Sequence, residues 1–214
     1  MITLLYSGNL GIGQDLHTLL HAVAGLNGDA DLRVSIVGSG KGLPAVRQLA
    51  AERKIRNVEF CESVPLHQLP DLLAQGDIHV ICQQPGTEGL LVPSKIYGTL
   101  SVGRPSIFFG PQECEVSRII QVSRSGFVVE PGDAIATMAA LITLARSEEM
   151  RREMGLNARR YYTENFGRRR SVARIIDVIE VVGRVGHTVR QSDSRTGQPS
   201  DRKTVATSPP TVRL

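Results

Sequence analysis

Short apolar runs rich in β-branched residues alternate with segments of helical period along most of the chain, and this alternation constrains the fold most. Strands are expected at residues 2–6, 32–37, 57–60, 77–82, 105–109 and 126–129. The segments between them place apolar residues three and four positions apart, so helices are expected there, with a last helix at 169–182. The pattern is typical of an α/β protein that has a parallel sheet with helices on both faces.

Two of the expected helices have recognisable starts. Ser94 is suited to the N-cap of a helix that reaches about Val102. Another helix is expected to open at Pro131-Gly132-Asp133. Its predicted inward side consists of Ile135, Met138, Ala139 and Ile142.

The net charge of +4 comes entirely from the end of the chain. From Gly183 onward there are six Lys and Arg residues and two Asp residues, so the preceding residues are neutral. The basic composition therefore gives no support to nucleic-acid binding. Ser, Thr, Arg, Pro and Gly dominate this end, and such a composition cannot bury enough apolar surface to order itself. We expect one domain at 1–182 and a disordered basic tail at 183–214.

Cysteine and histidine usage indicates neither a disulfide framework nor a metal site. Cys61, Cys82 and Cys114 are widely spaced and odd in number, which is typical of buried thiols in a reducing compartment. His17 and His21 have ligand-like spacing, but no Cys or carboxylate joins them. No signal peptide is recognised, and no apolar run reaches the roughly 18 residues of a membrane span. A cytoplasmic location is therefore expected.

Two glycine-rich turns, at residues 7–13 and 38–42, each follow a strand and precede a helix. Such turns let backbone amides approach an anion, and the following helix adds positive potential. The alternative is that the glycines only allow tight turns between strand and helix. The second turn also invites comparison with a nicotinamide-dinucleotide site, because Glu59 has the expected spacing. Leu43 occupies the position of the third small residue and argues against that site.

Residues 87–105 combine a carboxylate, a glycine-containing loop and a helix start. Glu88 precedes the loop, and Lys95 lies in the first helical turn after Ser94. A cation is unfavourable there for the helix dipole, by about 0.3–1 kcal/mol, whereas a charge-assisted bond to phosphate contributes about 1.5–3 kcal/mol. The placement of Lys95 favours a phosphate ligand, and the alternative is a solvated surface lysine.

Taken together, these segments resemble the C-terminal domain of the glycosyltransferase group 1 family, a Rossmann-like domain of the GT-B fold. The likeness extends over nearly all of residues 2–182 and is nearest to the PSK-type enzymes that build bacterial polysaccharides. The matching segments occur in family order. They are SGNLG, VGSGKG, the strand at 57–60, PDLLAQGDIHV, EGLLVPSKIYGTLSVGRPSI, GFVVEPGD, MRREMGLNAR and YTENF.

The resemblance implies a site for a nucleotide-diphospho-sugar. Glu88 would contact the donor sugar, Lys95 would lie beside the diphosphate, and residues 62–66 would lie near the base. The remaining expected donor contacts are Gly8, Asn9, Gly11, Gly38, Gly40, Gly89, Leu90, Leu91 and Ser94. Two customary contacts are missing, because Gly98 stands where the second Glu of the family motif is usual, and Asn9 and Asp15 stand where Arg and Lys are usual.

The family also implies a reaction and a partner. We expect a retaining transfer from a UDP-sugar or GDP-sugar to a polysaccharide or lipid-linked acceptor, with no cofactor and no metal. A complete GT-B enzyme has an N-terminal acceptor-binding domain, so we expect a truncated or split protein that transfers little or no sugar alone. Peripheral association with the inner membrane face would occur through the missing domain. The alternatives are a nucleotide-sugar epimerase of the same architecture and a nucleotide-binding fragment without catalysis.

Overall fold

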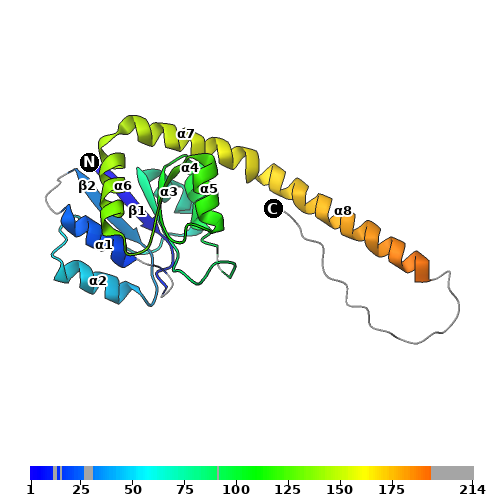
Figure 1. The fold of residues 1–214 in the computed structure, drawn as a ribbon, viewed down its shortest axis with the longest axis horizontal. Helices are drawn as coiled ribbons and strands as arrows, with labels where there is room; N and C mark the ends of the chain where they lie inside the picture. Colours follow the sequence, from blue (N-terminus) through cyan, green and yellow to red (C-terminus); the bar gives the residue numbers. More distant parts are fainter. Residues whose placement is uncertain (12–13, 15, 27–30, 91, 194–214) are drawn as a thin grey trace. The chain divides into compact units, whose positions relative to one another are not determined.

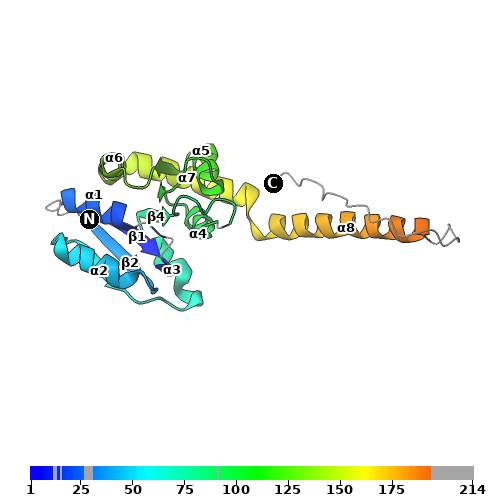
Figure 2. The ribbon, with the colours of Figure 1, turned by 60° about the horizontal axis from the view of Figure 1, so that its bottom comes forward.

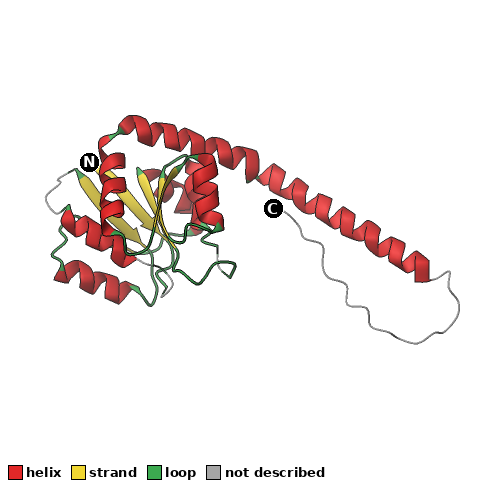
Figure 3. Cartoon of the chain, in the orientation of Figure 1, coloured by secondary structure: helices red, strands yellow, loops and turns green. Residues whose placement is uncertain are grey.

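The structure is a computed structural model that describes residues 1–11, 14, 16–26, 31–90 and 92–193. The chain divides into two units, residues 1–167 and residues 168–214. The first unit contains a six-stranded parallel sheet (Figure 1, Figure 3). Its strands are β1 (Ile2–Ser7), β2 (Leu32–Val37), β3 (Val58–Cys61), β4 (Ile78–Cys82), β5 (Ser106–Phe109) and β6 (Gly126–Val129). The expected parallel α/β fold is confirmed, and each strand lies within a residue or two of its expected range.

The strand order is β3-β2-β1-β4-β5-β6. The chain thus builds the sheet outward from β1 to β3, then returns to the other side of β1 and continues from β4 to β6. β1 pairs in parallel with both β2 and β4. The order reverses between β1 and β4, and open α/β sheets bind ligands at the carboxyl ends of the strands beside such a reversal.

Helices cover both faces of the sheet (Figure 1, Figure 2). They are α1 (Leu16–Gly25), α2 (Leu43–Glu52), the 3-10 turn η1 (Leu66–Gln68), α3 (Leu69–Gln75), α4 (Lys95–Val102), α5 (Glu115–Ser123), α6 (Ala134–Arg146) and α7 (Glu148–Asn165). One core cluster joins the sheet to α1, α2 and α6, and a second joins it to α4, α5 and α7. On β5, Ile107 and Phe109 belong to the first cluster and Phe108 to the second, as expected for side chains that alternate across a sheet.

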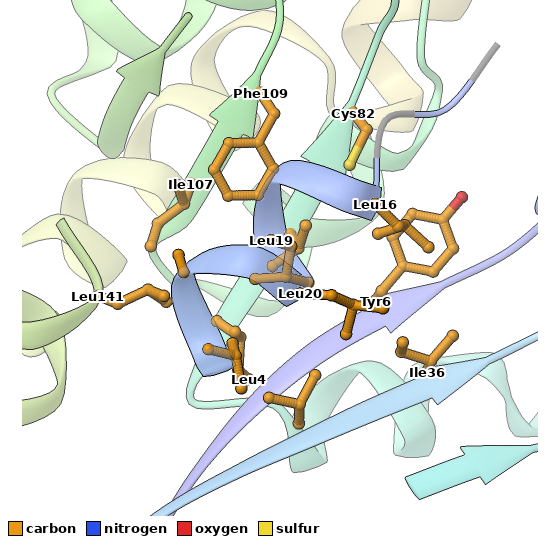
Figure 4. Packing of buried hydrophobic residues seen from close by; sticks show 14 of the residues in the cluster. Leu4, Tyr6, Leu16, Leu19, Leu20, Ile36, Cys82, Ile107, Phe109 and Leu141 are labelled. Carbon is orange, nitrogen blue, oxygen red and sulfur yellow. The ribbon is translucent and has the colours of Figure 1, made fainter. Parts of the chain in front are cut away.

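The first core cluster packs α1 against the centre of the sheet. Figure 4 shows Leu4 and Tyr6 of β1 close to Leu16, Leu19 and Leu20 of α1. All five side chains are at most 1% exposed. This packing holds the end of β1, and hence the first glycine turn, against the body of the domain.

The inward side of α6 differs from the expected one. Ile135 is 79% exposed, whereas Thr137, Ala140, Leu141 and Leu144 are buried. Thr137 is tolerated inside because its hydroxyl donates to the Asp133 carbonyl at 2.7 Å, which satisfies its donor. The prediction from apolar residues alone was therefore wrong for Ile135 and Ala139, which are exposed, whereas Met138 packs partly buried against the first core cluster.

The second unit contains α8 (Arg168–Asp193). The helix expected at 169–182 is present, but it continues eleven residues beyond Val182. The expected boundary at residue 182 therefore falls inside a helix, and residues 194–214 of the predicted tail lie outside the described residues. None of the helices in the described part of the chain has both the length and the apolar character needed to cross a membrane.

Candidate functional site

A cavity of about 410 Å³ lies where the strand order reverses, beside the carboxyl end of β1 and residues His79 and Val80 of β4. The residues after β1 and the first residues of α4 form its polar wall. These are Ser7, Gly8, Asn9, Ser94 and Lys95. The rest of the lining comes from Leu69, Leu73, His79, Val80, Gly98 and Thr99. The structure thus brings together four residues that the sequence assigned to one ligand, namely Gly8, Asn9, Ser94 and Lys95.

Lys95 is a partly buried cation beside this cavity. Its Nζ lies 5.2 Å from the centroid of the Tyr6 ring, and burial lowers the pKa of the ammonium group. Within the described part of the chain, no carboxylate lies within ion-pair distance of Lys95. A partly desolvated charge without a counter-ion is unfavourable, so an anion in the cavity would stabilise this arrangement.

Gly8 leaves the space that the Lys95 side chain occupies. A Cβ built on Gly8 would lie 2.7 Å from Lys95 Cε and 3.2 Å from Lys95 Nζ. Gly8 also has a φ of +130°, a conformation that a residue with a Cβ rarely adopts. The Lys95 side chain at the start of α4 therefore packs directly against the first glycine turn.

The two glycine turns pack directly on each other. The Gly8 amide donates to the Val37 carbonyl at 2.9 Å, the Leu10 amide to the Ser39 carbonyl at 2.8 Å, and the Gly42 amide to the Leu10 carbonyl at 2.8 Å. A Cβ on Gly38 would collide with the Gly8 carbonyl oxygen, and one on Gly40 with the Leu10 carbonyl oxygen.

These contacts reduce the number of backbone amides that the glycine turns could donate to a ligand. The turn-to-turn packing alone requires glycine at positions 38 and 40, and the amides of Gly8 and Leu10 are already hydrogen-bonded. The proposed contact of Gly38 and Gly40 with a nucleotide stays a prediction.

Tyr6 supports the first turn, although the sequence pattern predicts only a strand residue at this position. Its hydroxyl donates to the Asn9 carbonyl at 2.6 Å, and burial raises the pKa of the phenol far above its ordinary range. The phenol therefore remains a hydrogen-bond donor at any physiological pH. A single sequence gives no signal for this role, because a tyrosine near a strand end is equally typical of a packed core.

Glu88 and Gly89 line a different cavity, of about 570 Å³. The other residues of this lining are Gln83, Val92, Gln112, Glu113, Cys114, Glu115, Arg118 and Gln121. Leu90 is 87% exposed, and its amide donates to the Thr87 carbonyl at 3.2 Å. Leu91 lies outside the described residues. The structure therefore places Glu88 and Lys95 in two different cavities.

Gly11 lines a third cavity, of about 300 Å³, together with Lys41 and Gly42 of the second turn. The Gly11 amide donates to Gln14 Oε1 at 2.5 Å. Ser94 occupies the N-cap position of α4, as expected, but its side chain makes no capping hydrogen bond with the described amides of that helix. Its hydroxyl is thus available to the first cavity.

Two other residue sets raised by the sequence have ordinary surroundings. Glu59 lies on β3 and forms an ion pair with Arg33 at 3.7 Å. His17 lies on α1 and lines the third cavity. Among the residues that the structure describes, no three His, Cys, Asp or Glu side chains are grouped so that they could hold a metal ion.

Comparisons with known proteins identify the family of the chain. A family model described as "Glycosyl transferases group 1" matches residues 2–147. The putative colanic acid biosynthesis glycosyl transferase WcaI of Escherichia coli is 32% identical over 139 residues, which cover 64% of this chain and 34% of that protein. The probable glycosyltransferase WbjE of Pseudomonas aeruginosa is 28% identical over 137 residues, with the same coverage. The chain spans about a third of the length of these relatives.

Solved structures are similar in fold. A glycosyltransferase from Rickettsia africae superposes with a TM-score of 0.70 at 16% identity, over 83% of this chain and 47% of that one. Anabaena HepE in complex with UDP-glucose gives a TM-score of 0.64 at 16% identity, over 89% and 49%. The C-terminal domain of a glycosyl transferase group 1 family protein from Francisella tularensis gives 0.63 at 14% identity, over 77% and 85%. At these identities the likeness concerns the fold alone.

Proposed function

Since the chain belongs to the glycosyl transferases group 1 family, we propose that it is the donor-binding half of a retaining glycosyltransferase. The donor would be a UDP-sugar or GDP-sugar, and the acceptor a growing polysaccharide or a lipid-linked sugar. The name of WcaI, a protein of colanic acid biosynthesis, and the UDP-glucose complex of HepE support this choice. The acceptor-binding part would be supplied by sequence outside these 214 residues, because the chain spans only 34% of its relatives.

The observation that supports the proposal most is the position of Lys95. It reaches the carboxyl end of the sheet where the strand order reverses, and it lacks a described carboxylate partner. In the proposed reaction the bond between the anomeric carbon and the diphosphate oxygen breaks, and the electron pair goes to that oxygen. Lys95 would stabilise the negative charge of this leaving group, which is the usual role of a preorganised cation in transfer reactions.

The neighbouring residues would position the rest of the donor. Asn9 and Ser94 offer side-chain hydrogen bonds in the cavity of Lys95. Glu88 would accept hydrogen bonds from sugar hydroxyls in the cavity that it lines, since an ionised carboxylate is an acceptor only. The proposal assigns charge neutralisation to Lys95 and includes no metal. Peripheral membrane association through the acceptor-binding part stays a prediction.

The first prediction tests the charge of Lys95. Lys95→Met keeps the apolar stem that packs on Gly8 and Tyr6 but removes the ammonium. We expect UDP or GDP, whichever binds the full chain, to bind about 10 to 100 times more weakly, as for the loss of a charge-assisted hydrogen bond. Isothermal titration calorimetry measures this ratio. The chain alone should bind nucleotide without transferring sugar.

Arg53→Ala is the matched control for this titration. Arg53 is an exposed cation at the end of α2, so its loss changes the net charge equally but should leave the affinity within about twofold. An unchanged affinity in Lys95→Met would remove the assigned role. Failure of both UDP and GDP to bind the folded chain at millimolar concentration would remove the proposed donor site itself.

A further inference from the structure

A fourth cavity, of about 640 Å³, lies at the amino ends of the strands, whereas Lys95 lies at their carboxyl ends. Two of its lining residues directly precede strands: Asp77 comes immediately before β4, and Arg104 comes two residues before β5. The cavity therefore lies at the amino ends of these strands. The C-terminal end of α4 and one side of α7 form the remaining walls. We call it the arginine cavity, because four arginines line it: Arg104, Arg151, Arg152 and Arg159.

A close approach of two backbones creates the arginine cavity. Gly103 ends α4 with a φ of +66°, and Gly155 of α7 lies directly against it. A Cβ on Gly155 would collide with the Gly103 carbonyl oxygen. Glu148, Arg152 and Arg159 project from the same side of α7, because they lie four and seven residues apart along the helix. The close contact between Gly103 and Gly155 thus brings the side chains of α7 next to the C-terminal end of α4.

Three of the guanidinium groups are held in place by helix carbonyls. Arg104 donates to the Ala74 carbonyl at 3.1 Å, and Arg151 donates to the carbonyls of Leu144 at 2.6 Å and Ala145 at 2.9 Å. Arg159 donates to the Ser101 carbonyl. Each of these contacts uses one terminal nitrogen of a guanidinium that has five N–H donors, so most donors remain available. Such anchored groups lose less conformational entropy when they bind a ligand.

The charges around the arginine cavity do not cancel. Its lining has two carboxylates, Asp77 and Glu148, against four arginines. Asp77 is partly engaged, because its Oδ2 accepts from the Thr3 amide at 2.9 Å and its Oδ1 lies 4.0 Å from Arg104. Arg152 has no hydrogen-bond or ion-pair partner among the side chains and carbonyls that the structure describes. A ligand with two negative charges would balance the site.

We propose that the arginine cavity binds a phosphate-bearing ligand, either a free phosphate compound or the headgroup of an anionic lipid. The planar guanidinium matches phosphate oxygens with two parallel hydrogen bonds, which an ammonium cannot do. The cavity lies at the amino ends of the strands, so this site is separate from the proposed donor site at their carboxyl ends. The inference does not depend on the proposed donor site.

The test follows backbone amide resonances of the full chain during titration with inorganic pyrophosphate. We expect shifts at the Gly103 and Gly155 amides that persist in Lys95→Met, because Lys95 lies at the carboxyl ends of the strands. Arg152→Gln and Arg159→Gln should each weaken this binding by about threefold or more, as for partly exposed charge pairs. Arg160→Gln is the matched control, since Arg160 belongs to α7 but does not line the cavity.

A second arm identifies the source of the phosphate. The full chain is sedimented with phosphatidylglycerol vesicles and with phosphatidylcholine vesicles. Binding to the anionic vesicles that is weakened about threefold or more in Arg152→Gln but kept in Arg160→Gln would identify a lipid headgroup. Pyrophosphate shifts without vesicle binding would identify a free phosphate compound. The proposal is overturned if neither the Gly103 nor the Gly155 amide shifts at about 10 mM pyrophosphate, which would fill even a millimolar site. It is equally overturned if the shifts are the same in all three arginine variants.

Discussion

Gly38→Ala is expected to lower the free energy of unfolding by more than about 3 kcal/mol, because it combines backbone strain with a backbone collision. Gly38 has a φ of +147°, and its added Cβ would overlap the Gly8 carbonyl oxygen and lie 3.2 Å from Leu10 Cδ1. The Gly8 carbonyl has little freedom to retreat, because the adjacent Gly8 amide is bonded to Val37. Urea denaturation followed by circular dichroism measures the loss.

The same substitution should disturb the donor site before the domain unfolds. Relief of the collision would move the turn on which the Lys95 side chain rests. We therefore expect weaker nucleotide binding in Gly38→Ala at temperatures where its circular dichroism spectrum is native.

Gly86→Ala separates backbone strain from collision. Gly86 has a φ of +83°, and nothing lies within 4 Å of a Cβ built on it. This control should therefore lose only about 1 kcal/mol, the ordinary cost of a side chain in the left-handed region. Equal losses in the two variants would show that the contact between the glycine turns does not require glycine at position 38.

The sheet could be predicted from the sequence because its strands are buried on both faces. Leu4 and Leu5 are adjacent on β1 and are 0% and 1% exposed, so this strand is buried on both faces and is mostly apolar. On β4 all five residues are buried, and His79 is the one polar residue among them. Runs of this kind, separated by glycine turns, indicate the strands and their approximate ends without knowledge of the pairing.

Helices at the surface were harder to predict. The expected helices did not include α7 (Glu148–Asn165), on which only Gly155 and Ala158 are fully buried. Its larger apolar residues recur at helical spacing but are only partly buried, namely Met150, Met154, Tyr161 and Tyr162. At Gly155 the helix packs on the end of α4 through close backbone contact. The predicted inward side of α6 was wrong in part, since buried Thr137 replaces an apolar residue where its hydroxyl has a partner.

The candidate site was predictable where its residues follow strand ends. Gly8 and Lys95 are 87 residues apart in the sequence, but each follows a strand. The carboxyl ends of parallel strands lie on the same side of a sheet, which brings the two residues together. The remaining lining of the Lys95 cavity was not predictable, because Leu73 and His79 look like core residues of a helix and a strand. The separation of Glu88 from Lys95 depends on the path of one loop, which no periodic pattern specifies.

Acidification is expected to destabilise the first unit through His79, which lines the candidate donor cavity. The pKa of His79 is lowered from 6.5 to about 4, chiefly by burial. The hydrogen bond to the Leu73 carbonyl opposes this shift, the charge of Arg104 adds to it, and the charge of Asp77 opposes it. The unfolded chain therefore binds a proton between pH 6.5 and pH 4 that the folded chain excludes. The stability from His79 is fully present above pH 6.5 and is lost as the pH falls toward 4, by about 3 kcal/mol in total.

His79→Gln isolates this contribution. The ring Nε2 lies 3.0 Å from the Leu73 carbonyl and must donate to it, and the glutamine amide can supply a similar donor without a titrating group. Urea denaturation of both proteins at a series of pH values between 7 and 4 gives the comparison. The wild-type chain should lose about 3 kcal/mol more than the variant over this range. An equal loss of unfolding free energy in the two proteins would mean that His79 already accepts its proton in the folded state. The His79 side of the donor cavity would then be more hydrated than its burial implies.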